Sequence, residues 1–132
     1  MKIVLVGCSR VGAMVAMALS ERGDDVTVID INRHSFARLG PDFKGTMVVG
    51  NGIDEDVLRQ AGIEAADGFA SLTNGDNRNI MAAQIAREVF KVKWVITRIN
   101  DPMRENVYRE LGLNTICPTQ SGAHQIHAML RG

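Results

Sequence analysis

The chain has 132 residues, so we expect one globular domain over residues 1–132. Hydrophobic residues make up 45% and charged residues 23%, a balance that excludes a disordered or fibrous chain. Fifteen basic side chains balance fifteen acidic ones, so we expect no nucleic-acid partner and no attraction to an anionic membrane. No apolar stretch approaches the roughly 20 residues that span a bilayer. The two cysteines, Cys8 and Cys117, form neither a disulfide framework nor a metal site, and a cytoplasmic location fits best.

Apolar runs alternate with helical patterns along the chain. In the first half, the patterns predict a strand over Ile3–Val6, a helix over Val11–Arg22, a strand over Val26–Ile31, a short helix over Ser35–Leu39, a strand over Thr46–Val49 and a helix that Asp54 caps and that reaches Ala61. In the second half, they predict a strand over Gly68–Leu72, a helix over Asn77–Phe90, a strand over Trp94–Ile99, a helix from Pro102 that Asp101 caps and Gly112 ends, a strand over Asn114–Cys117 that Pro118 stops, and a helix over Ser121–Leu130. Six strands alternating with helices predict an α/β fold. We expect a doubly wound, six-stranded parallel sheet of Rossmann-like order 3-2-1-4-5-6 with helices on both faces.

The first predicted strand runs directly into GCSRVG at residues 7–12, where the dinucleotide-binding fingerprint has G-x-G-x-x-G. Gly7 permits a tight turn, and Gly12 lets the helix pack closely on the sheet. The amides and dipole of the helix start favour a pyrophosphate there. Ser9 replaces the middle glycine, and its hydroxyl either donates to a phosphate oxygen or displaces the ligand outward.

An acidic residue follows at the end of the second predicted strand. Asp30 lies 18 residues beyond Gly12, where a carboxylate accepts hydrogen bonds from the hydroxyls of an adenosine ribose. NAD(H) or an adenine nucleotide is therefore favoured over NADP(H), although Arg33 keeps a 2′-phosphate in consideration. The alternative is that Asp30 only caps a turn and that the glycines serve packing alone.

Five blocks of the sequence are similar to a known family. They are KIVLVGCSRVG, VTVIDIN, VVGNGIDEDVLRQAGIEAAD, LTNGDNRNIMAAQIARE and TRINDP…LGLNTICPT. Together they resemble the N-terminal domain of RCK (regulator of K⁺ conductance) proteins, the cytoplasmic regulatory subunits of Trk/Ktr-type potassium uptake systems. The resemblance covers nearly the whole chain. It implies that NAD(H), ATP, ADP or AMP binds here without turnover.

The resemblance also implies three groups of binding residues. The residues expected around the phosphates are Gly7, Cys8, Ser9, Arg10, Val11 and Gly12. Those expected around the ribose and base are Asp30, Ile31, Asn32, Arg33, Gly50, Asn51 and Gly52, with the glycines leaving space for the base. Those expected near the terminal phosphates or the second half of a dinucleotide are Leu72, Thr73, Asn74 and Asp76, with Arg98 as a phosphate or intersubunit contact.

Several other side chains have simpler interpretations. Cys8 is interpreted as a packing residue although a helix start can activate a thiol. Three methionines, Met14, Met17 and Met81, are interpreted as core or contact fillers. Two histidines three residues apart, His124 and His127, lack further metal ligands nearby and favour an exposed or interface helix face.

The last predicted helix carries the apolar stripe Ala123, Ile126, Met129 and Leu130, which packs either on its own sheet or on another subunit. We expect a homodimer or higher homo-oligomer, because this region crosses toward a partner subunit in the family. The resemblance further implies a non-catalytic sensor that gates a membrane-embedded potassium transporter or channel from the inner face of the cell membrane. Two alternatives stay open: the nucleotide-binding domain of an NAD-dependent oxidoreductase, and an assembly module whose site is vestigial.

Overall fold

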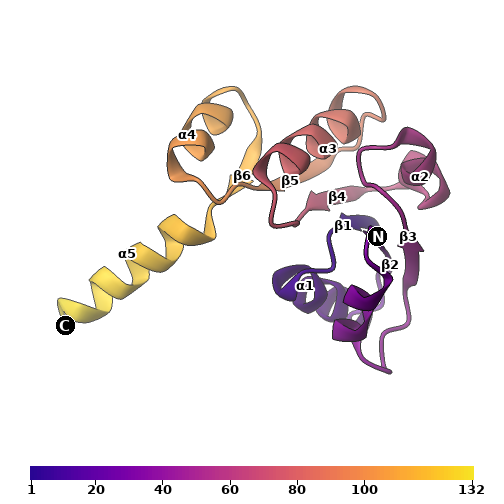
Figure 1. Cartoon of the computed structure of the whole chain (residues 1–132), viewed down its shortest axis with the longest axis horizontal. Helices are drawn as coiled ribbons and strands as arrows, with labels where there is room; N and C mark the ends of the chain where they lie inside the picture. The colour runs from indigo at the N-terminus through magenta and orange to yellow at the C-terminus, as the bar shows by residue number, and fades with distance from the viewer.

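A six-stranded parallel sheet forms the centre of the molecule (Figure 1). The computed structural model describes all residues 1–132. The strands are β1 (Lys2–Val6), β2 (Asp25–Asp30), β3 (Thr46–Val49), β4 (Gly68–Ser71), β5 (Trp94–Arg98) and β6 (Asn114–Ile116). Their spatial order is β3-β2-β1-β4-β5-β6, so the predicted doubly wound topology is confirmed. The order reverses between β1 and β4, and the carboxyl ends of these strands meet at one edge of the sheet.

The helices lie on both sides of the sheet, with α1 on one side and α2, α3 and α4 on the other (Figure 1). Their bounds are α1 (Arg10–Glu21), the 3-10 helix η1 (Arg33–Leu39), α2 (Glu55–Gln60), the 3-10 helix η2 (Ile63–Ala65), α3 (Asp76–Glu88), α4 (Pro102–Glu110) and α5 (Pro118–Leu130). The predicted caps are confirmed, since the Asp54 and Asp101 side chains accept hydrogen bonds from the second residues of α2 and α4. Each helix is too short or too polar to cross a bilayer.

The start of the last helix was predicted wrongly. The strand ends before Pro118 as predicted, since β6 ends at Ile116, but α5 begins at Pro118 itself and not at about Ser121. Proline lacks an N–H group, and the first helical position has no intrahelical partner for that group, so proline is well suited to it. The short helix η2 was also not expected.

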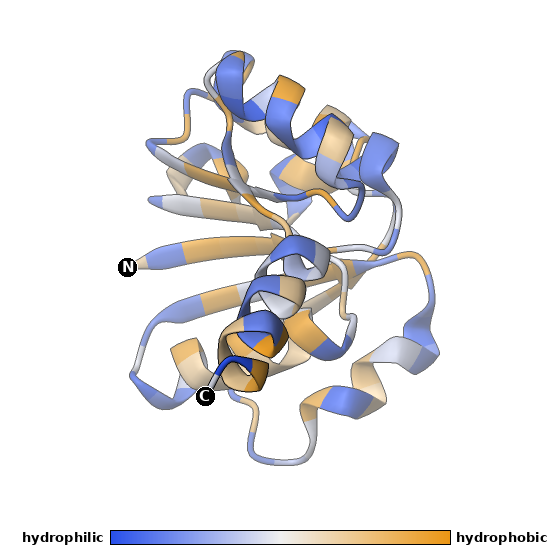
Figure 2. Cartoon of the chain, turned by 90° about the vertical axis from the view of Figure 1, so that its left-hand side faces the viewer, coloured by the Kyte–Doolittle hydropathy of each residue, from blue (hydrophilic) through white to orange (hydrophobic).

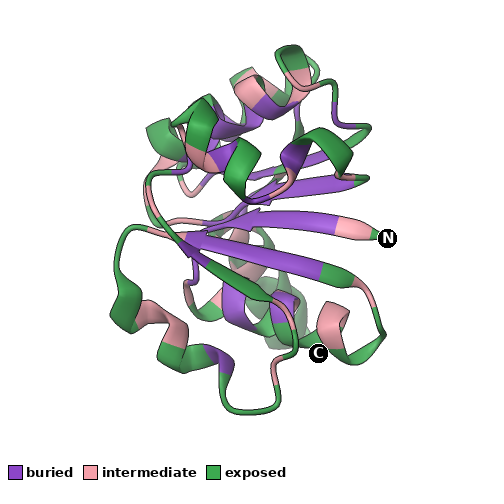
Figure 3. Cartoon of the chain, turned by 90° about the vertical axis from the view of Figure 1, so that its right-hand side faces the viewer, coloured by how far each residue is buried: buried purple, intermediate pink, exposed green.

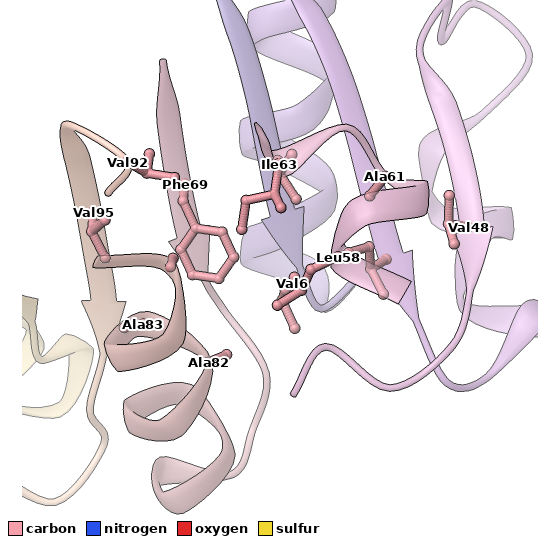
Figure 4. Close-up of a cluster of buried hydrophobic side chains, with 13 residues drawn as sticks. Val6, Val48, Leu58, Ala61, Ile63, Phe69, Ala82, Ala83, Val92 and Val95 are labelled. Carbon is pink, nitrogen blue, oxygen red and sulfur yellow. The ribbon is translucent and has the colours of Figure 1, made fainter. Parts of the chain in front are cut away.

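Side-chain alternation along β1 divides the core between the two faces of the sheet. Val4 and Val6 belong to a cluster with Phe69 and the side chains of α2 and α3 (Figure 4). Ile3 and Leu5 point the other way and pack with residues of α1, β2 and η1. All four are buried, which confirms the prediction that this strand is covered on both faces (Figure 3).

One face of the sheet edge is left uncovered. Val95 packs in the α3-side cluster, so Trp94 and Ile96 point to the opposite face, where they are 54% and 45% exposed. Ile116 of the neighbouring strand β6 is 44% exposed. On this side α1 and η1 contact β1 and β2 rather than β5 and β6.

Helix α5 extends away from the sheet (Figure 1) and has no buried residue. Figure 2 looks onto this helix from its free end and shows hydrophobic and hydrophilic residues along it. Its apolar stripe therefore does not pack on its own sheet. Met14, Met17 and Met81 were interpreted as core or contact fillers; all three are exposed, so the core interpretation is wrong and the contact interpretation stays a prediction.

Candidate functional site: a pocket at the switch point of the sheet

A pocket of about 240 Å³ lies at the carboxyl ends of the central strands, where the strand order reverses. Ten of the residues predicted from the sequence line it: Gly7, Cys8, Ser9, Asp30, Ile31, Gly50, Asn51, Gly52, Thr73 and Asn74. They come from the ends of β1, β2, β3 and β4. The fold therefore brings together segments that are up to about half the chain apart in sequence, as the switch-point rule for doubly wound sheets requires.

The loop after β1 presents free backbone donors beside this pocket. Gly7 has a φ of 103°, a conformation that a side chain disfavours, and Gly12 packs so closely that a Cβ there would lie 2.0 Å from the Gly7 carbonyl oxygen. The N–H groups of Ser9, Arg10 and Val11 have no hydrogen-bond partner in the chain. Three unpaired donors at the start of a 12-residue helix form an arrangement that binds anions.

The Ser9 side chain stabilises the loop. Its hydroxyl oxygen accepts a hydrogen bond from the Gly12 N–H (3.1 Å), which caps α1. The same hydroxyl donates to the Leu72 carbonyl oxygen (2.7 Å) at the end of β4. Its proton is therefore engaged within the fold, and the substitution of the middle glycine has a structural role that neither of the two sequence interpretations included.

Asp30 both lines the pocket and holds the loop. One carboxylate oxygen accepts from the Cys8 N–H (2.8 Å) and the other from the Asn32 N–H (2.8 Å). A carboxylate has about four lone-pair positions, so acceptor capacity remains for the hydroxyls of a ribose. The two interpretations of Asp30, turn cap and ligand acceptor, are therefore compatible.

The Cys8 side chain is fully buried, which confirms its interpretation as a packing residue. Burial raises the pKa of the Cys8 thiol, and the neighbouring negative charge of Asp30 raises it further against the opposing effect of Arg38. The thiol is therefore protonated at neutral pH and is not an activated nucleophile.

The glycines of the loop after β3 have a different role from the one expected. A Cβ on Gly50 would lie 2.8 Å from a methyl group of Val57, and one on Gly52 would lie 2.3 Å from a methyl group of Val6. The space that these glycines leave is filled by protein side chains. Their backbone lines the pocket because α2 and β1 pack closely behind it.

Eight predicted residues do not line the pocket: Arg10, Val11, Gly12, Asn32, Arg33, Leu72, Asp76 and Arg98. Four of them have other roles in the fold, as the side chains of Asn32, Arg98, Leu72 and Asp76 show. Asn32 caps η1 by accepting from the His34 N–H. Arg98 donates to the Asn100 side chain (3.0 Å), and Leu72 is buried in the core.

Asp76 connects α3 to the loop after β5. Its carboxylate accepts from the Asn100 N–H (2.7 Å) and the Asp101 N–H (3.1 Å). Partial burial raises the pKa of this carboxyl, but the hydrogen bonds from Asn100 and Asp101 and the charge of Arg104 outweigh burial and lower the pKa overall. Asp76 is therefore held ionised by contacts within the fold.

Sequence reasoning missed three polar lining residues: Ser35, Arg38 and Arg78. Ser35 and Arg38 are three residues apart on a 3-10 helix, a spacing that places both on one face, so that pattern was available in the sequence. Arg38 donates to the Cys8 carbonyl oxygen (3.0 Å). Arg78 lies in the first turn of α3, directly after the Thr73–Asn74 segment.

Behind the pocket, Asn79 joins the ends of β4 and β5. Its side chain is completely buried and makes four hydrogen bonds. The amide oxygen accepts from the N–H (2.9 Å) and hydroxyl (2.6 Å) of Thr73, and the amide nitrogen donates to the carbonyl oxygens of Thr73 and Arg98 (2.9 Å each). Asn79 thus fixes the pocket wall at Thr73.

Comparisons with known proteins agree with this geometry. A family model described as the TrkA-N domain matches residues 3–118. The Trk system potassium uptake protein TrkA of Streptomyces coelicolor is 49% identical over 126 residues, which cover 96% of this chain and 56% of that protein. The TrkA homolog of Pyrococcus abyssi is 34% identical over 111 residues, which cover 84% of this chain and 49% of that protein. The chain spans about half the length of these curated relatives.

Solved structures share the fold at lower identity. The Kef CTD of Shewanella denitrificans in AMP bound form has a TM-score of 0.83 at 18% identity and covers 100% of this chain and 82% of its own. The GsuK RCK domain has a TM-score of 0.82 at 23% identity and covers 98% of this chain and 28% of its own. The match to the TrkA-N model, which extends over most of the chain, confirms the resemblance found in the sequence: this chain belongs to the TrkA-N domain family.

Proposed function

We propose that this chain is a nucleotide-sensing domain that binds NAD(H) or an adenine nucleotide without turning it over. The observation that carries this proposal is that the pocket brings the carboxylate of Asp30 together with the loop of residues 7–9, beside the free N–H groups of Ser9, Arg10 and Val11 at the start of α1. The carboxylate suits ribose hydroxyls, and the helix start suits a phosphate. Structures of similar fold support it, since their names describe a Kef CTD in AMP bound form and GsuK bound to ADP.

The proposed role is regulatory. The pocket lining offers no paired general acid and base, since Asp30 is its only carboxylate and the Cys8 thiol is protonated. Relatives named as Trk potassium uptake proteins support regulation of a potassium transporter or channel from the cytoplasmic face of the membrane. A ligand regulates such a partner by binding two arrangements of the domain with different affinity.

We further propose that the domain forms a homodimer. Helix α5 exposes Ile126, Met129 and Leu130 by 60–82%, and the uncovered sheet face exposes Trp94, Ile96 and Ile116. Two apolar surfaces of this kind on one small domain favour burial between identical copies. Sedimentation analysis of the purified chain tests this: Ile126→Asp is expected to shift a dimer toward monomer, and a wild-type monomer at all concentrations would contradict it.

The nucleotide site is tested by calorimetric titration of the purified chain with AMP, ADP, ATP, NAD and NADH in separate runs. Asp30→Ala is expected to weaken binding by about tenfold or more, because losing a charged hydrogen-bond acceptor costs about 1.5–3 kcal/mol. Asp25→Ala is the matched control, since it removes an exposed aspartate from the other end of β2. Thermal unfolding of each variant separates loss of binding from loss of fold.

Three outcomes would contradict the proposal in different ways. Unchanged affinity in Asp30→Ala would refute the ribose assignment. Absence of binding with every nucleotide would refute the sensor and favour a vestigial site. Oxidation of added hydroxy acids with NAD, followed as nicotinamide absorbance, would show an oxidoreductase instead.

A further inference from the structure

The pocket contains one positive charge that the fold leaves unpaired. Arg78 lines the pocket beside Thr73 and Asn74, and it makes no ion pair or hydrogen bond within the chain. The other lining arginine, Arg38, is tied to the Cys8 carbonyl oxygen. Together the lining holds two guanidinium groups and one carboxylate, Asp30. The balance is positive and suits an anionic ligand.

The Arg78 guanidinium lies against Gly75. A Cβ on Gly75 would come within 2.8 Å of the Arg78 Nε and 3.0 Å of its Nη2. The guanidinium is thus folded back over the glycine, next to the pocket wall, instead of extending from the first turn of α3. The hydrogen at Gly75 leaves the space that this position needs.

The acidic residue nearest to Arg78 in sequence does not neutralise it. Both carboxylate oxygens of Asp76 are engaged by N–H groups of the loop after β5. The Asn100 side chain donates to the same carboxylate (3.1 Å). Asp30, the only carboxylate in the lining, lies at the end of β2, on the far side of β1 from α3. Arg78 is therefore available to a ligand.

The order of the strands indicates which part of a nucleotide reaches Arg78. Asp30 ends β2, the loop of residues 7–9 follows β1, and Thr73 follows β4; these strands are neighbours in that order. Adjacent strands lie about 4.8 Å apart, so the path from Asp30 past the loop to β4 covers roughly 10 Å. A ribose at Asp30 places its 5′-phosphate over the loop. The next phosphoryl group then extends toward the end of β4 and α3.

We propose that Arg78 binds this second phosphoryl group and makes the pocket selective for nucleotides with a pyrophosphate, such as ADP, ATP or a dinucleotide, over AMP. The inference rests on the proposed nucleotide site and adds the residue that distinguishes ligands within it. A guanidinium makes paired, charge-assisted hydrogen bonds to phosphate oxygens, whereas the loop amides contact the first phosphate in every case.

The test is the ratio of ADP to AMP affinity, measured by calorimetry on the wild-type chain, Arg78→Gln and Gly75→Ala. Arg78→Gln is expected to weaken ADP binding by about tenfold or more and AMP binding by less than about twofold, so the ratio falls. Gly75→Ala retains the arginine but displaces its guanidinium, and it is expected to lower the same ratio. Arg104→Gln is the control, because it removes an equal charge from α4, outside the pocket.

The outcomes separate this inference from the proposed function. If ADP and AMP bind the wild-type chain and Arg78→Gln weakens both equally or neither, the selectivity assigned to Arg78 is wrong while the nucleotide site stands. If Arg104→Gln lowers the ratio as much as Arg78→Gln does, net charge rather than the position of Arg78 sets the preference, and the inference is again overturned. If the wild-type chain binds no nucleotide, both proposals fail.

Discussion

Replacement of Asn79 by alanine tests whether the wall of the pocket depends on one buried amide. The side chain is 0% exposed and lies between the ends of β4 and β5, where it bonds to Thr73 three times and to Arg98 once. Alanine can replace none of these bonds. The Thr73 hydroxyl keeps a longer contact to the Gly75 carbonyl oxygen (3.3 Å). The Thr73 N–H, the Thr73 carbonyl oxygen and the Arg98 carbonyl oxygen, however, lose their hydrogen bonds to Asn79.

The expected cost follows from those three groups. An unpaired, buried backbone donor or acceptor costs about 1–3 kcal/mol, and the lower value applies here because Thr73 and Arg98 are only partly buried. Three groups at about 1 kcal/mol give a loss of about 3 kcal/mol in the free energy of unfolding. Since a domain of this size has about 5–15 kcal/mol in total, the variant should fold but with clearly reduced stability.

Equilibrium unfolding in urea, followed by circular dichroism at 222 nm, measures this loss. With a slope of about 1.5 kcal/mol/M, 3 kcal/mol shifts the midpoint by about 2 M. Asn77→Ala is the matched control, because Asn77 is exposed in the same helix; its expected change is within about 0.5 kcal/mol. A loss below about 1 kcal/mol in Asn79→Ala, or a loss equal to that of the control, would refute the reasoning.

Two further changes test polar groups near the site. Because hydrogen bonds and the charge of Arg104 lower the pKa of Asp76 in the folded chain, its contribution is present above the pKa of an unfolded aspartate, about 3.9, and is lost as pH falls through the folded value. Asp76→Asn should therefore cost about 1–3 kcal/mol at pH 7, and urea midpoints should show the difference shrinking toward pH 3; a constant difference would contradict this. The Thr97 hydroxyl is buried without a partner, so Thr97→Val should increase the free energy of unfolding by roughly 1 kcal/mol and thereby raise the thermal midpoint. A lower midpoint would show an unrecognised hydrogen bond.

The order of the elements and the topology could be predicted because they depend on local patterns. The run Ile3–Val6 has no polar residue, which is typical of a strand covered on both faces, and it is buried in the structure. Asp54 and Asp101 act as helix caps through hydrogen bonds that span two residues. Such interactions involve near neighbours in sequence, and right-handed crossovers then leave few ways to order the strands.

The position of most lining residues could also be predicted, since the carboxyl ends of parallel strands meet at one edge of the sheet. What each side chain does there could not. The Ser9 hydroxyl bonds to Leu72, 63 residues away, and a methyl group of Val6 occupies the space beside Gly52. These contacts depend on how the strands and helices pack, and sequence periodicity carries no information about them.

The alternation of strands and helices, the glycine loop after β1 and the acidic end of β2 could therefore be predicted from the order of the residues alone. Three features became visible only in the folded chain: Asp76 holds a loop instead of lining the pocket, Arg78 is the unpaired charge in the pocket lining, and α5 does not cover the sheet. This difference follows from the separation in sequence between interacting residues. Hydrophobic periodicity and helix caps involve near neighbours in sequence, whereas charge pairing and burial depend on which distant segments come into contact.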